Sequence, residues 1–469
     1  MNNNQATTTS INTTPHKDPI ILAYCRIKGP RHMPNGRENI AVVGAGISGM
    51  CAAYALSKNH EVTLFEQAPK AGGHADTVRA EVSDALIDVD MGFIVLNDRT
   101  YPAFTKLLQQ LGVVPVRSDM SFGVSHKSNG YHLEYAGHAK GLFARPSQFF
   151  DRRYRAMLRD LVRLYRAGQR DAEHASSFSA MSLGDYVRQL GLGTEVVSYH
   201  LAPMVAAIWS TPHQHVMDFP ARAFLDFYRH HGLFHFVDRP TWYTIKGGSH
   251  MYVDKLLPQV GKFRASSPVE AVTRTSEGRV VVRAGGVSVP FDRVVLAVHA
   301  DQIPKLLGNS MTAEEKQLFG AVSYSSNRAV LHRDQGLMPR AKNCWSSWNV
   351  LQWGDEEGVS LTYWMNKLQP LRTKDQIFVT LNPTREPGEI LRETTYRHPL
   401  MNGAMDRLQA ELSSLQGVGH VYFCGAWCGY GFHEDGAEAG LSVAARMGSA
   451  PDWWRDLSPT SSSRKNIGS

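Results

Sequence analysis

The sequence predicts an α/β protein, and three observations carry that prediction. An apolar, β-branched run at residues 40–43 leads through a glycine-rich turn into an alanine-rich segment that ends at Leu56, which is the order strand, turn, helix. A second run, from Glu61 to Phe65, has the composition of a strand. The chain also has 469 residues, of which 43% are hydrophobic, enough material for the cores of two or three domains.

The glycines of the first turn have the spacing of a dinucleotide-binding motif. Gly44 permits a tight turn, Gly46 lets the backbone approach a pyrophosphate, and Gly49 lets the helix lie against the strand. Glu66 follows Gly46 by twenty residues, where a carboxylate can accept hydrogen bonds from a ribose. The uncharged run 40–56 has seventeen residues, fewer than the about 20 of a membrane-spanning helix. A glycine-tolerant core helix would not account for the following strand and its acid, so we expect a Rossmann-like, dinucleotide-binding domain.

The loop after the second strand indicates which dinucleotide is bound. It begins at Gln67 and places Gly72 and Gly73 shortly after the acidic strand end, followed by His74. This segment resembles the family of flavin-containing amine oxidoreductases, in which a loop with paired glycines wraps the diphosphate and ribityl chain of FAD. The family usually has arginines beside these glycines, whereas this chain has Lys70 before them and His74 after them.

The resemblance continues along most of the chain. Residues 245–248 resemble the family's central glycine pair, residues 267–272 the strand whose valine (Val269 here) meets the adenine, and residues 291–301 the strand that returns to the FAD domain. Residues 421–444 resemble the C-terminal flavin motif, which is a strand, a loop under the isoalloxazine and a helix. The resemblance implies noncovalent FAD, which is also contacted or oriented by Ala45, Ser48, Gly425, Ala426, Phe432, Glu434 and Asp435.

Glu434 and Asp435 have a second interpretation, because acidic residues favour helix N-termini and can cap the helix that follows.

The resemblance also implies an interleaved domain organisation. We expect the FAD domain at residues 38–100, 240–310 and 415–448, and an inserted α+β substrate domain of the amine oxidase type at residues 101–239 and 311–414. Residues 1–37 are rich in asparagine and threonine and are expected to be a flexible extension without a secretory signal, although an organelle transit segment stays open. The serine-rich residues 449–469 are expected to be a disordered tail.

Composition argues against several other kinds of site. Five irregularly spaced cysteines do not form a disulfide framework, which favours a reducing compartment and a cytoplasmic protein. Cys424 and Cys428 lack two further ligands for zinc and match no flavin-linking motif, so we expect buried small residues and no metal site. The net charge of +7 is spread along the chain without a nucleic-acid recognition motif, and nucleic-acid binding is not expected.

The substrate class depends on how the chain departs from true amine oxidases. Those enzymes place a lysine near flavin N5 and two tyrosines in a cage around the amine. The corresponding strand here, Tyr324 to His332, has no lysine, and Phe432 or His433 stands where a cage tyrosine would be. Both departures weaken the amine interpretation.

A bacterial branch of the family, described only as predicted NAD/FAD-binding proteins, gives a closer resemblance at residues 90–97, 363–369 and 425–441. A related flavoprotein region is fused to cyclopropane fatty acid synthases in plants. This implies hydride transfer to flavin N5 from a lipophilic, fatty acyl substrate, in a C–C dehydrogenation or a double-bond isomerisation. An amine oxidase, or a non-catalytic flavoprotein partner of a lipid-modifying enzyme, are the alternatives. A set of aromatic residues suits a lipophilic pocket or a β-rich core equally: Trp345, Trp348, Trp353, Tyr363 and Trp364.

His433 is the candidate catalytic residue, because the resemblance places it close to the flavin. An imidazole there could take or return a proton as hydride moves, with a titration in the usual imidazole range. The alternative is a structural histidine that only hydrogen-bonds the flavin or a backbone carbonyl.

Residues 152–170 form a predicted basic amphipathic helix. Arginines at 155, 159, 163, 166 and 170 follow one helical stripe, and apolar residues follow another. Together with residues 141–143 and 149–150, this segment could rest peripherally on an anionic membrane or admit a lipid. The alternative is a surface helix that packs its apolar stripe on its own domain.

Overall fold

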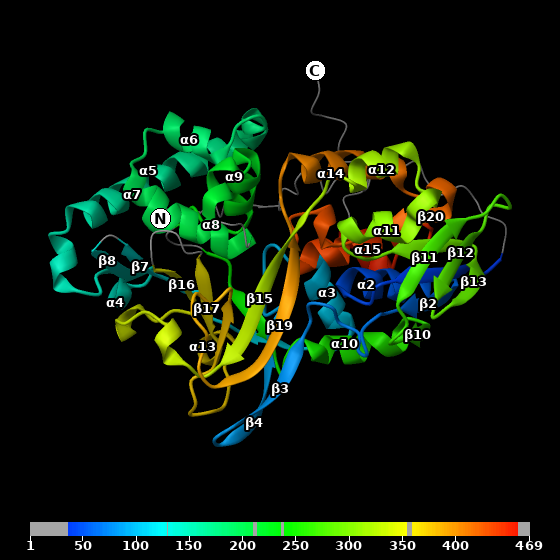
Figure 1. Ribbon diagram of the computed structural model, residues 1–469, viewed down its shortest axis with the longest axis horizontal. Helices are drawn as coiled ribbons and strands as arrows, with labels where there is room; N and C mark the ends of the chain where they lie inside the picture. Colours follow the sequence, from blue (N-terminus) through cyan, green and yellow to red (C-terminus); the bar gives the residue numbers. More distant parts are fainter. Residues whose placement is uncertain (1–35, 129, 210–212, 236–238, 354–358, 458–469) are drawn as a thin grey trace, which may run out of the picture.

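A computed structural model describes residues 36–457 except 129, 210–212, 236–238 and 354–358. Its centre is a five-stranded, entirely parallel sheet at the right of Figure 1. The strands, in spatial order, are β10 (Lys262–Arg264), β2 (Glu61–Phe65), β1 (Asn39–Val43), β14 (Arg293–Leu296) and β20 (Val421–Phe423). Because a parallel sheet is covered on both faces, its inner strands are almost continuously apolar. The architecture confirms the predicted α/β class.

Two helices from opposite ends of the chain pack against each other, and the first of them packs against this sheet. They are α2 (Ile47–Leu56) and α15 (His433–Arg446). A Cβ on Gly49 would lie 1.8 Å from the carbonyl oxygen of Gly44, and a Cβ on Gly440 would lie 2.1 Å from the carbonyl oxygen of Ser48. Both glycines are therefore required by close backbone contact.

Smaller sheets and helices surround the central sheet. β11 (Val269–Arg274), β12 (Val280–Ala284) and β13 (Val287–Phe291) form an antiparallel sheet beside it. β5 (Val95–Asn97), β9 (Trp242–Ile245) and β6 (Pro115–Arg117) form another, and β3 (Thr77–Val82) and β4 (Ala85–Asp90) form a projecting hairpin. The helices of this half include α3 (Pro102–Gln110), α10 (His250–Leu256), α11 (Ile303–Leu307), α12 (Ala313–Phe319) and α14 (Gly403–Leu415).

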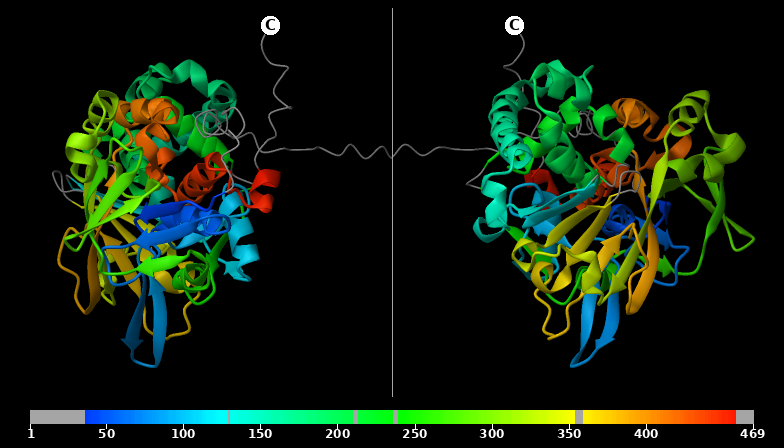
Figure 2. Two further views of the ribbon diagram at one scale, coloured as in Figure 1. Left: turned by 90° about the vertical axis from the view of Figure 1, so that its right-hand side faces the viewer. Right: turned by 60° about the vertical axis from the view of Figure 1, so that its left-hand side comes forward.

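The other half combines a seven-stranded mixed sheet with helices above it, as Figures 1 and 2 show. The strand order is β19 (Ile390–Pro399), β15 (Tyr324–His332), β18 (Phe378–Leu381), β17 (Ser360–Trp364), β16 (Trp348–Trp353), β7 (Phe122–Ser128) and β8 (Tyr131–Ala136). The helices are α4 (Ala139–Leu142), α5 (Arg152–Asp171), α6 (Leu183–Gln189), α7 (Thr194–Val196), α8 (Ala202–Trp209) and α9 (Ala221–His230), with α13 (Met365–Leu368) below. The expected residue boundaries of the two domains stay a prediction.

The predicted basic amphipathic helix is α5, and its apolar side is covered by its own domain. Tyr154, Met157, Leu164 and Tyr165 are buried in two neighbouring apolar clusters, while the arginines at 155, 159, 163, 166 and 170 are exposed. The helix therefore packs its apolar stripe on its own domain, as the alternative to a membrane-facing stripe expected.

The predicted disordered tail is wrong for its first residues. Helix α16 (Asp452–Leu457) buries Trp453 and Trp454 and contacts α3, because two indole rings provide enough apolar area to dock a short helix. Residues 458–469, like residues 1–35 of the expected N-terminal extension, lie outside the described residues.

Two other predictions concern cysteines and the membrane. Cys424 and Cys428 are free and buried, as expected for small core residues. No helix within the described ranges is long and apolar enough to cross a membrane.

The contact between α2 and α15 generates a stability prediction. Gly440→Ala is expected to lower the free energy of unfolding by about 2 kcal/mol or more, because the new methyl group would overlap the Ser48 carbonyl oxygen. Denaturant unfolding measures the change. The matched control is Gly403→Ala, where an added Cβ has no atom within 4 Å and the expected effect is neutral or slightly stabilising. Equal stability of the two variants would contradict the close contact.

Candidate active site

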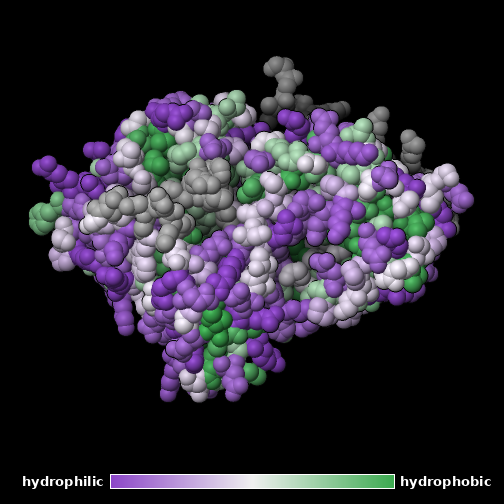
Figure 3. Space-filling view, in the orientation of Figure 1, coloured by the Kyte–Doolittle hydropathy of each residue, from purple (hydrophilic) through white to green (hydrophobic). Residues whose placement is uncertain are grey.

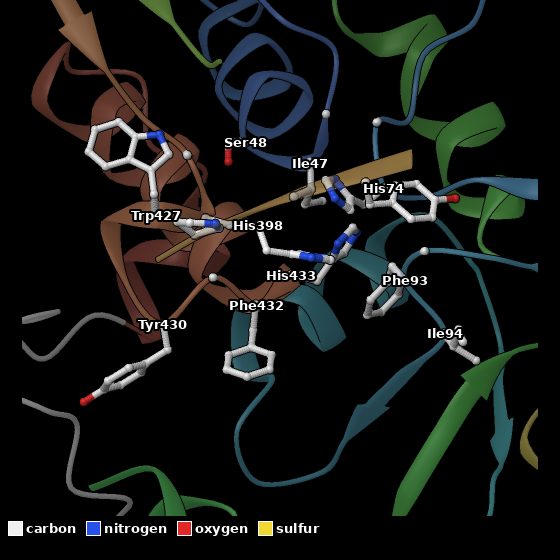
Figure 4. A pocket seen from close by; sticks show the side chains of 18 of the residues that line it. Ile47, Ser48, His74, Phe93, Ile94, His398, Trp427, Tyr430, Phe432 and His433 are labelled. Carbon is white, nitrogen blue, oxygen red and sulfur yellow. The ribbon is translucent and has the colours of Figure 1, made fainter. Parts of the chain in front are cut away.

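A cavity of about 930 Å³ extends from the carboxyl end of the parallel sheet to the seven-stranded sheet. One half is lined by the glycine-rich turn, the loop after β2 and the loop before α15. The other half is lined by α8, α9 and strands of the second sheet. Figure 4 shows Ile47, His74, His398 and His433 grouped in its middle.

The glycine-rich turn borders an open space, called the cradle below, between residues 44–46, the loop at residues 72–73 and the N-terminus of α2. Gly44 has φ +100°, and a Cβ there would lie 2.5 Å from the carbonyl oxygen of Ala297, so the turn requires glycine. At Gly46 a Cβ would meet no atom within 4 Å, and it is the N-cap of α2, with no side-chain cap from the described chain. A Cβ on Gly73 would lie 3.1 Å from the Gly46 Cα. The turn and the loop therefore face one another around an uncapped helix N-terminus, which is a binding site for phosphates.

Glu66 links the glycine-rich turn to the loop after β2 through hydrogen bonds. Its carboxylate accepts hydrogen bonds from the backbone N–H groups of Ala45 at 2.7 Å and Ala68 at 2.9 Å. The Gly72 N–H donates to the Ala45 carbonyl oxygen at 2.9 Å. Because Glu66 also lines the cavity, it stands where the sequence predicted a ribose contact, but it has a structural role as well.

Most of the predicted site residues line the cavity, and five do not. The lining residues are Gly44, Gly46, Ser48, Glu66, Gln67, Gly73, His74, Val269, Gly425, Ala426, Phe432 and His433. Those behind the wall are Ala45, Gly49, Gly72, Glu434 and Asp435. Ala45, Gly49 and Gly72 act through the backbone contacts described above.

The two acids at the start of α15 cap two different helices. The Glu434 carboxylate accepts hydrogen bonds from the N–H groups of Ala103 at 2.7 Å and Phe104 at 2.8 Å, at the N-terminus of α3. Asp435 accepts from the N–H groups of Tyr430 at 3.1 Å and Phe432 at 2.8 Å, and so caps its own helix. Of their two predicted roles, the geometry shows helix capping, and for Glu434 the capped helix is a neighbour.

His433 is held as a neutral, buried ring. It stacks on Phe93 with ring centroids 3.8 Å apart, and its Nε2 lies 2.7 Å from the hydroxyl oxygen of the buried Tyr252. Burial, and secondarily the nearby His74, lowers the pKa of His433 to about 3. This lowered pKa argues against a titration in the usual imidazole range, because charging the ring would cost its desolvation, and the catalytic role of His433 stays a prediction. The alternative was a structural histidine that only hydrogen-bonds the flavin or a backbone carbonyl. His433 does make such a hydrogen bond, but its partner is the hydroxyl group of Tyr252.

Two further histidines join His74 in the cavity wall, and sequence reasoning missed them. The ring centroid of His74 lies 5.5 Å from that of His398 and 6.2 Å from that of His299. Burial, followed by repulsion among these rings, lowers the pKa of His74 to about 3, and burial chiefly lowers that of His398 to about 4. Lys70 donates to Asp76 at 2.6 Å. The wall therefore presents neutral imidazoles where the family usually has arginine.

These histidines also leave polar atoms for a ligand. Nε2 of His74 and Nδ1 of His299 are buried and have no hydrogen-bond partner within the described part of the chain. With the open space at Gly46, they make the cavity fit a polar, phosphate-bearing cofactor. His299 follows β14 in the segment 291–301 that the resemblance assigned to the FAD domain, but nothing singled out its side chain. His398 lies within β19, far from the glycine motif, and no pattern in the sequence marked it.

The second half of the cavity is largely apolar and aromatic. Its lining includes Phe93, Ile94, Val95, Met120, Phe122, Met204, Ile208, Trp209, Phe227, Leu233, Trp242, Trp348, Tyr363, Leu381, Tyr430 and Phe432. Of the aromatic residues that suited either pocket or core, Trp348 and Tyr363 line the cavity, whereas Trp345 packs on Trp364 at 5.4 Å between ring centroids.

The charged side chains of this half are Arg117, Arg239, Arg397 and Asp119. Arg397 is ion-paired with Asp301 at 2.5 Å. Asp119 is ion-paired with Lys367 at 3.3 Å and accepts hydrogen bonds from the hydroxyl groups of Ser121 and Ser347. The lining therefore favours an apolar ligand with an anionic end.

Comparison with known proteins agrees with this geometry. The pattern of the family described as flavin containing amine oxidoreductase matches residues 47–341. An L-amino-acid oxidase of Gloydius halys is 46% identical over 48 residues, which is 10% of each protein. The chain spans only that tenth of this relative.

Two solved structures share the fold. A putrescine oxidase with putrescine bound aligns with a TM-score of 0.63 and 16% identity, covering 88% of this chain and 99% of that one. A CLA-producing fatty acid isomerase from P. acnes aligns with a TM-score of 0.62 and 14% identity, covering 88% and 98%.

The open cradle predicts a variant that folds but does not bind the cofactor. Gly46→Val is expected to lower FAD affinity by about 100-fold or more, because the side chain would fill the space beside the uncapped helix. Its φ of −73° suits any residue, so the melting temperature of the cofactor-free protein is expected to stay close to wild type. Fluorescence titration with FAD measures affinity, and wild-type affinity would place the phosphates elsewhere.

The buried histidines predict acid sensitivity. The pKa is lowered by burial at His74, His200, His231, His332, His398 and His433. Between about pH 6.5 and pH 4 the unfolded state holds protons that the folded state does not, so the free energy of unfolding falls as the pH falls.

His433→Asn should make that slope shallower by up to about 1.4 kcal/mol per pH unit, the value for one proton. Denaturant unfolding at a series of pH values measures it, with His174→Asn at an exposed position as the matched control. An unchanged slope in the His433 variant would show that this ring titrates normally.

Proposed function

The chain belongs to the flavin-containing amine oxidoreductase family, and from this premise we propose that it acts with FAD on a lipophilic carboxylic acid, a fatty acyl chain. Membership makes the protein a flavoenzyme and an oxidoreductase. The observation that supports the substrate class is the apolar and aromatic half of the cavity, with Arg117 and Arg239 in its wall.

The residues of the cradle fit a noncovalently bound FAD. Gly46, Gly73 and the N-terminus of α2 would hold the diphosphate, Glu66 a ribose, and Val269 the adenine end. The loop at Gly425 and Ala426 would lie against the flavin ring. Bound FAD supplies acceptance of a hydride from a substrate carbon.

The chain's own residues favour an acid over an amine as substrate. An alkylammonium group is held by a free carboxylate or by a pair of cage tyrosines, but Asp119 is occupied by Lys367, and Phe432 or His433 stands at one cage position. A carboxylate, in contrast, can accept charge-assisted hydrogen bonds from an arginine. The apolar lining would exclude water from the acyl chain.

The isomerisation of a double bond and a C–C dehydrogenation differ in redox balance. Isomerisation returns the hydride to the substrate at another carbon and is redox-neutral. Dehydrogenation leaves two electrons that need an acceptor such as dioxygen or a quinone. The proposal includes the redox-neutral reaction, because a fatty acid isomerase has the same fold.

The proposal predicts a preference for fatty acids over amines. Under anaerobic conditions, the FAD-loaded protein is expected to lose its visible flavin absorbance with a fatty acid, or to convert an unsaturated fatty acid to a positional isomer detected by gas chromatography and mass spectrometry. Putrescine and other amines should give neither result. Arg117→Gln should raise KM for the acid by about tenfold or more, because a charge-assisted hydrogen bond is lost, without changing FAD content.

The matched control is Arg407→Gln, at an exposed position on α14. Flavin reduction by amines but not by fatty acids would contradict the proposal and support the amine oxidase alternative.

A further inference from the structure

Two neighbouring aromatic residues that precede α5 are exposed to solvent. Phe149 is 55% exposed and Phe150 is 84% exposed, in the short connection between η1 (Pro146–Phe149) and α5. Figure 3 shows that one face of the molecule is mostly hydrophilic, with apolar side chains exposed in small scattered areas. Two adjacent exposed aromatic rings lower the solubility of a protein, and such groups commonly mark a surface that contacts a partner or a membrane.

The connection is built to hold these rings outward. Phe149 stacks on Phe143 with ring centroids 3.9 Å apart, and Phe143 in turn packs on Tyr154. Gln148 is buried, and its side-chain amide donates to the Glu134 carbonyl oxygen at 2.7 Å. The Phe150 N–H donates to the Ser147 carbonyl oxygen at 3.1 Å. The ring of Phe149 is therefore held by stacking, and the backbone of Phe150 is held in the turn with its ring in solvent.

The surroundings of these two rings are basic. Exposed cations precede and follow the rings: Lys140, Arg145, Arg152, Arg153 and Arg155. The nearby carboxylates are engaged, since Asp151 caps α5 and accepts from the Tyr131 hydroxyl group at 2.8 Å, and Glu134 is buried. No ion pair within the described ranges engages Arg152 or Arg155. The basic face continues along α5 at Arg159, Arg163, Arg166 and Arg170.

A second exposed apolar tip on the same molecule has more acidic surroundings. Leu86, in the β3–β4 hairpin, is 63% exposed, and it lies among Glu81, Asp84 and Asp88, of which Asp88 is ion-paired with Arg79. The hairpin is the lowest projection in Figure 1. The two tips therefore expose similar apolar groups, but the hairpin lacks the run of exposed cations beside Phe150, so the Phe150 tip suits an anionic surface better.

We propose that the Phe150 tip, comprising Phe149, Phe150 and the cations at 140, 145, 152, 153 and 155, docks on the surface of a membrane that contains anionic lipids. The two rings enter the headgroup layer, where aromatic side chains are favoured, and the arginines contact the lipid phosphates. Exposed rings flanked by cations match an apolar layer covered by anionic headgroups. Docking uses no residue of the cavity and does not depend on the proposed substrate.

Sedimentation with vesicles tests the docking. The FAD-loaded protein is expected to bind vesicles of phosphatidylcholine with phosphatidylglycerol, to bind pure phosphatidylcholine at least tenfold more weakly, and to be released by salt. Phe149→Ala with Phe150→Ala, and separately Arg152→Glu with Arg155→Glu, should each weaken binding by about tenfold or more. Leu86→Ala is the matched control and should bind as wild type does.

Unchanged FAD content and melting temperature show that each variant is folded. Vesicle binding that both double variants retain would overturn the proposal, as would equal binding to both lipid compositions. A wild-type dimer, seen by analytical ultracentrifugation and lost in the phenylalanine variant without any vesicle binding, would also overturn it, because the rings would then contact a second copy of the chain.

Discussion

The close crossing of α2 and α15 is the constraint on which the rest of the site depends. Gly440 lies against the Ser48 carbonyl oxygen, and a Cβ on Gly436 would lie 2.7 Å from the side chain of Ile47. Only helices without side chains at these points can approach so closely. The contact fixes a segment near residue 440 onto one near residue 48, and so places the loop before α15 opposite the glycine-rich turn. Glu434 then reaches the N-terminus of α3 and fixes a third element to the same point.

The parts of the site that could be predicted from the sequence are those determined by neighbours in the chain. The roles of Gly44 and Gly49, and the position of Glu66 at the cavity, follow from a turn and a strand within about twenty residues, because backbone conformation and close approach leave few alternatives. The start of α15 was predicted through a family resemblance. The partner of Glu434 could not be predicted, because an acid at a helix N-terminus suggests its own helix, and a neighbouring helix is a tertiary outcome.

His433 shows why residue type alone does not determine chemistry. Sequence position suggested a histidine beside the flavin, and a histidine suggested proton transfer. Burial against Phe93 and the hydrogen bond with Tyr252 leave no room for a charged ring, so the pKa falls far below the usual range. The same reasoning applies to His74, which is neutral where a family member has arginine. This wall of the cavity therefore offers dipoles and hydrogen bonds in place of a charge, and Arg117 and Arg239 belong to another part of the lining.

The basic helix illustrates a different limit. An amphipathic pattern indicates only that one side of a helix is shielded from water. A protein core and a membrane can both shield it. In α5 the stripe is used internally, since Tyr154, Met157, Leu164 and Tyr165 are buried. The residues that remain for an external surface are Phe149 and Phe150, which precede the helix and contribute nothing to its periodicity. Exposure in the folded chain, rather than helical periodicity, therefore separates the membrane-facing part of this segment from the part that holds the domain together.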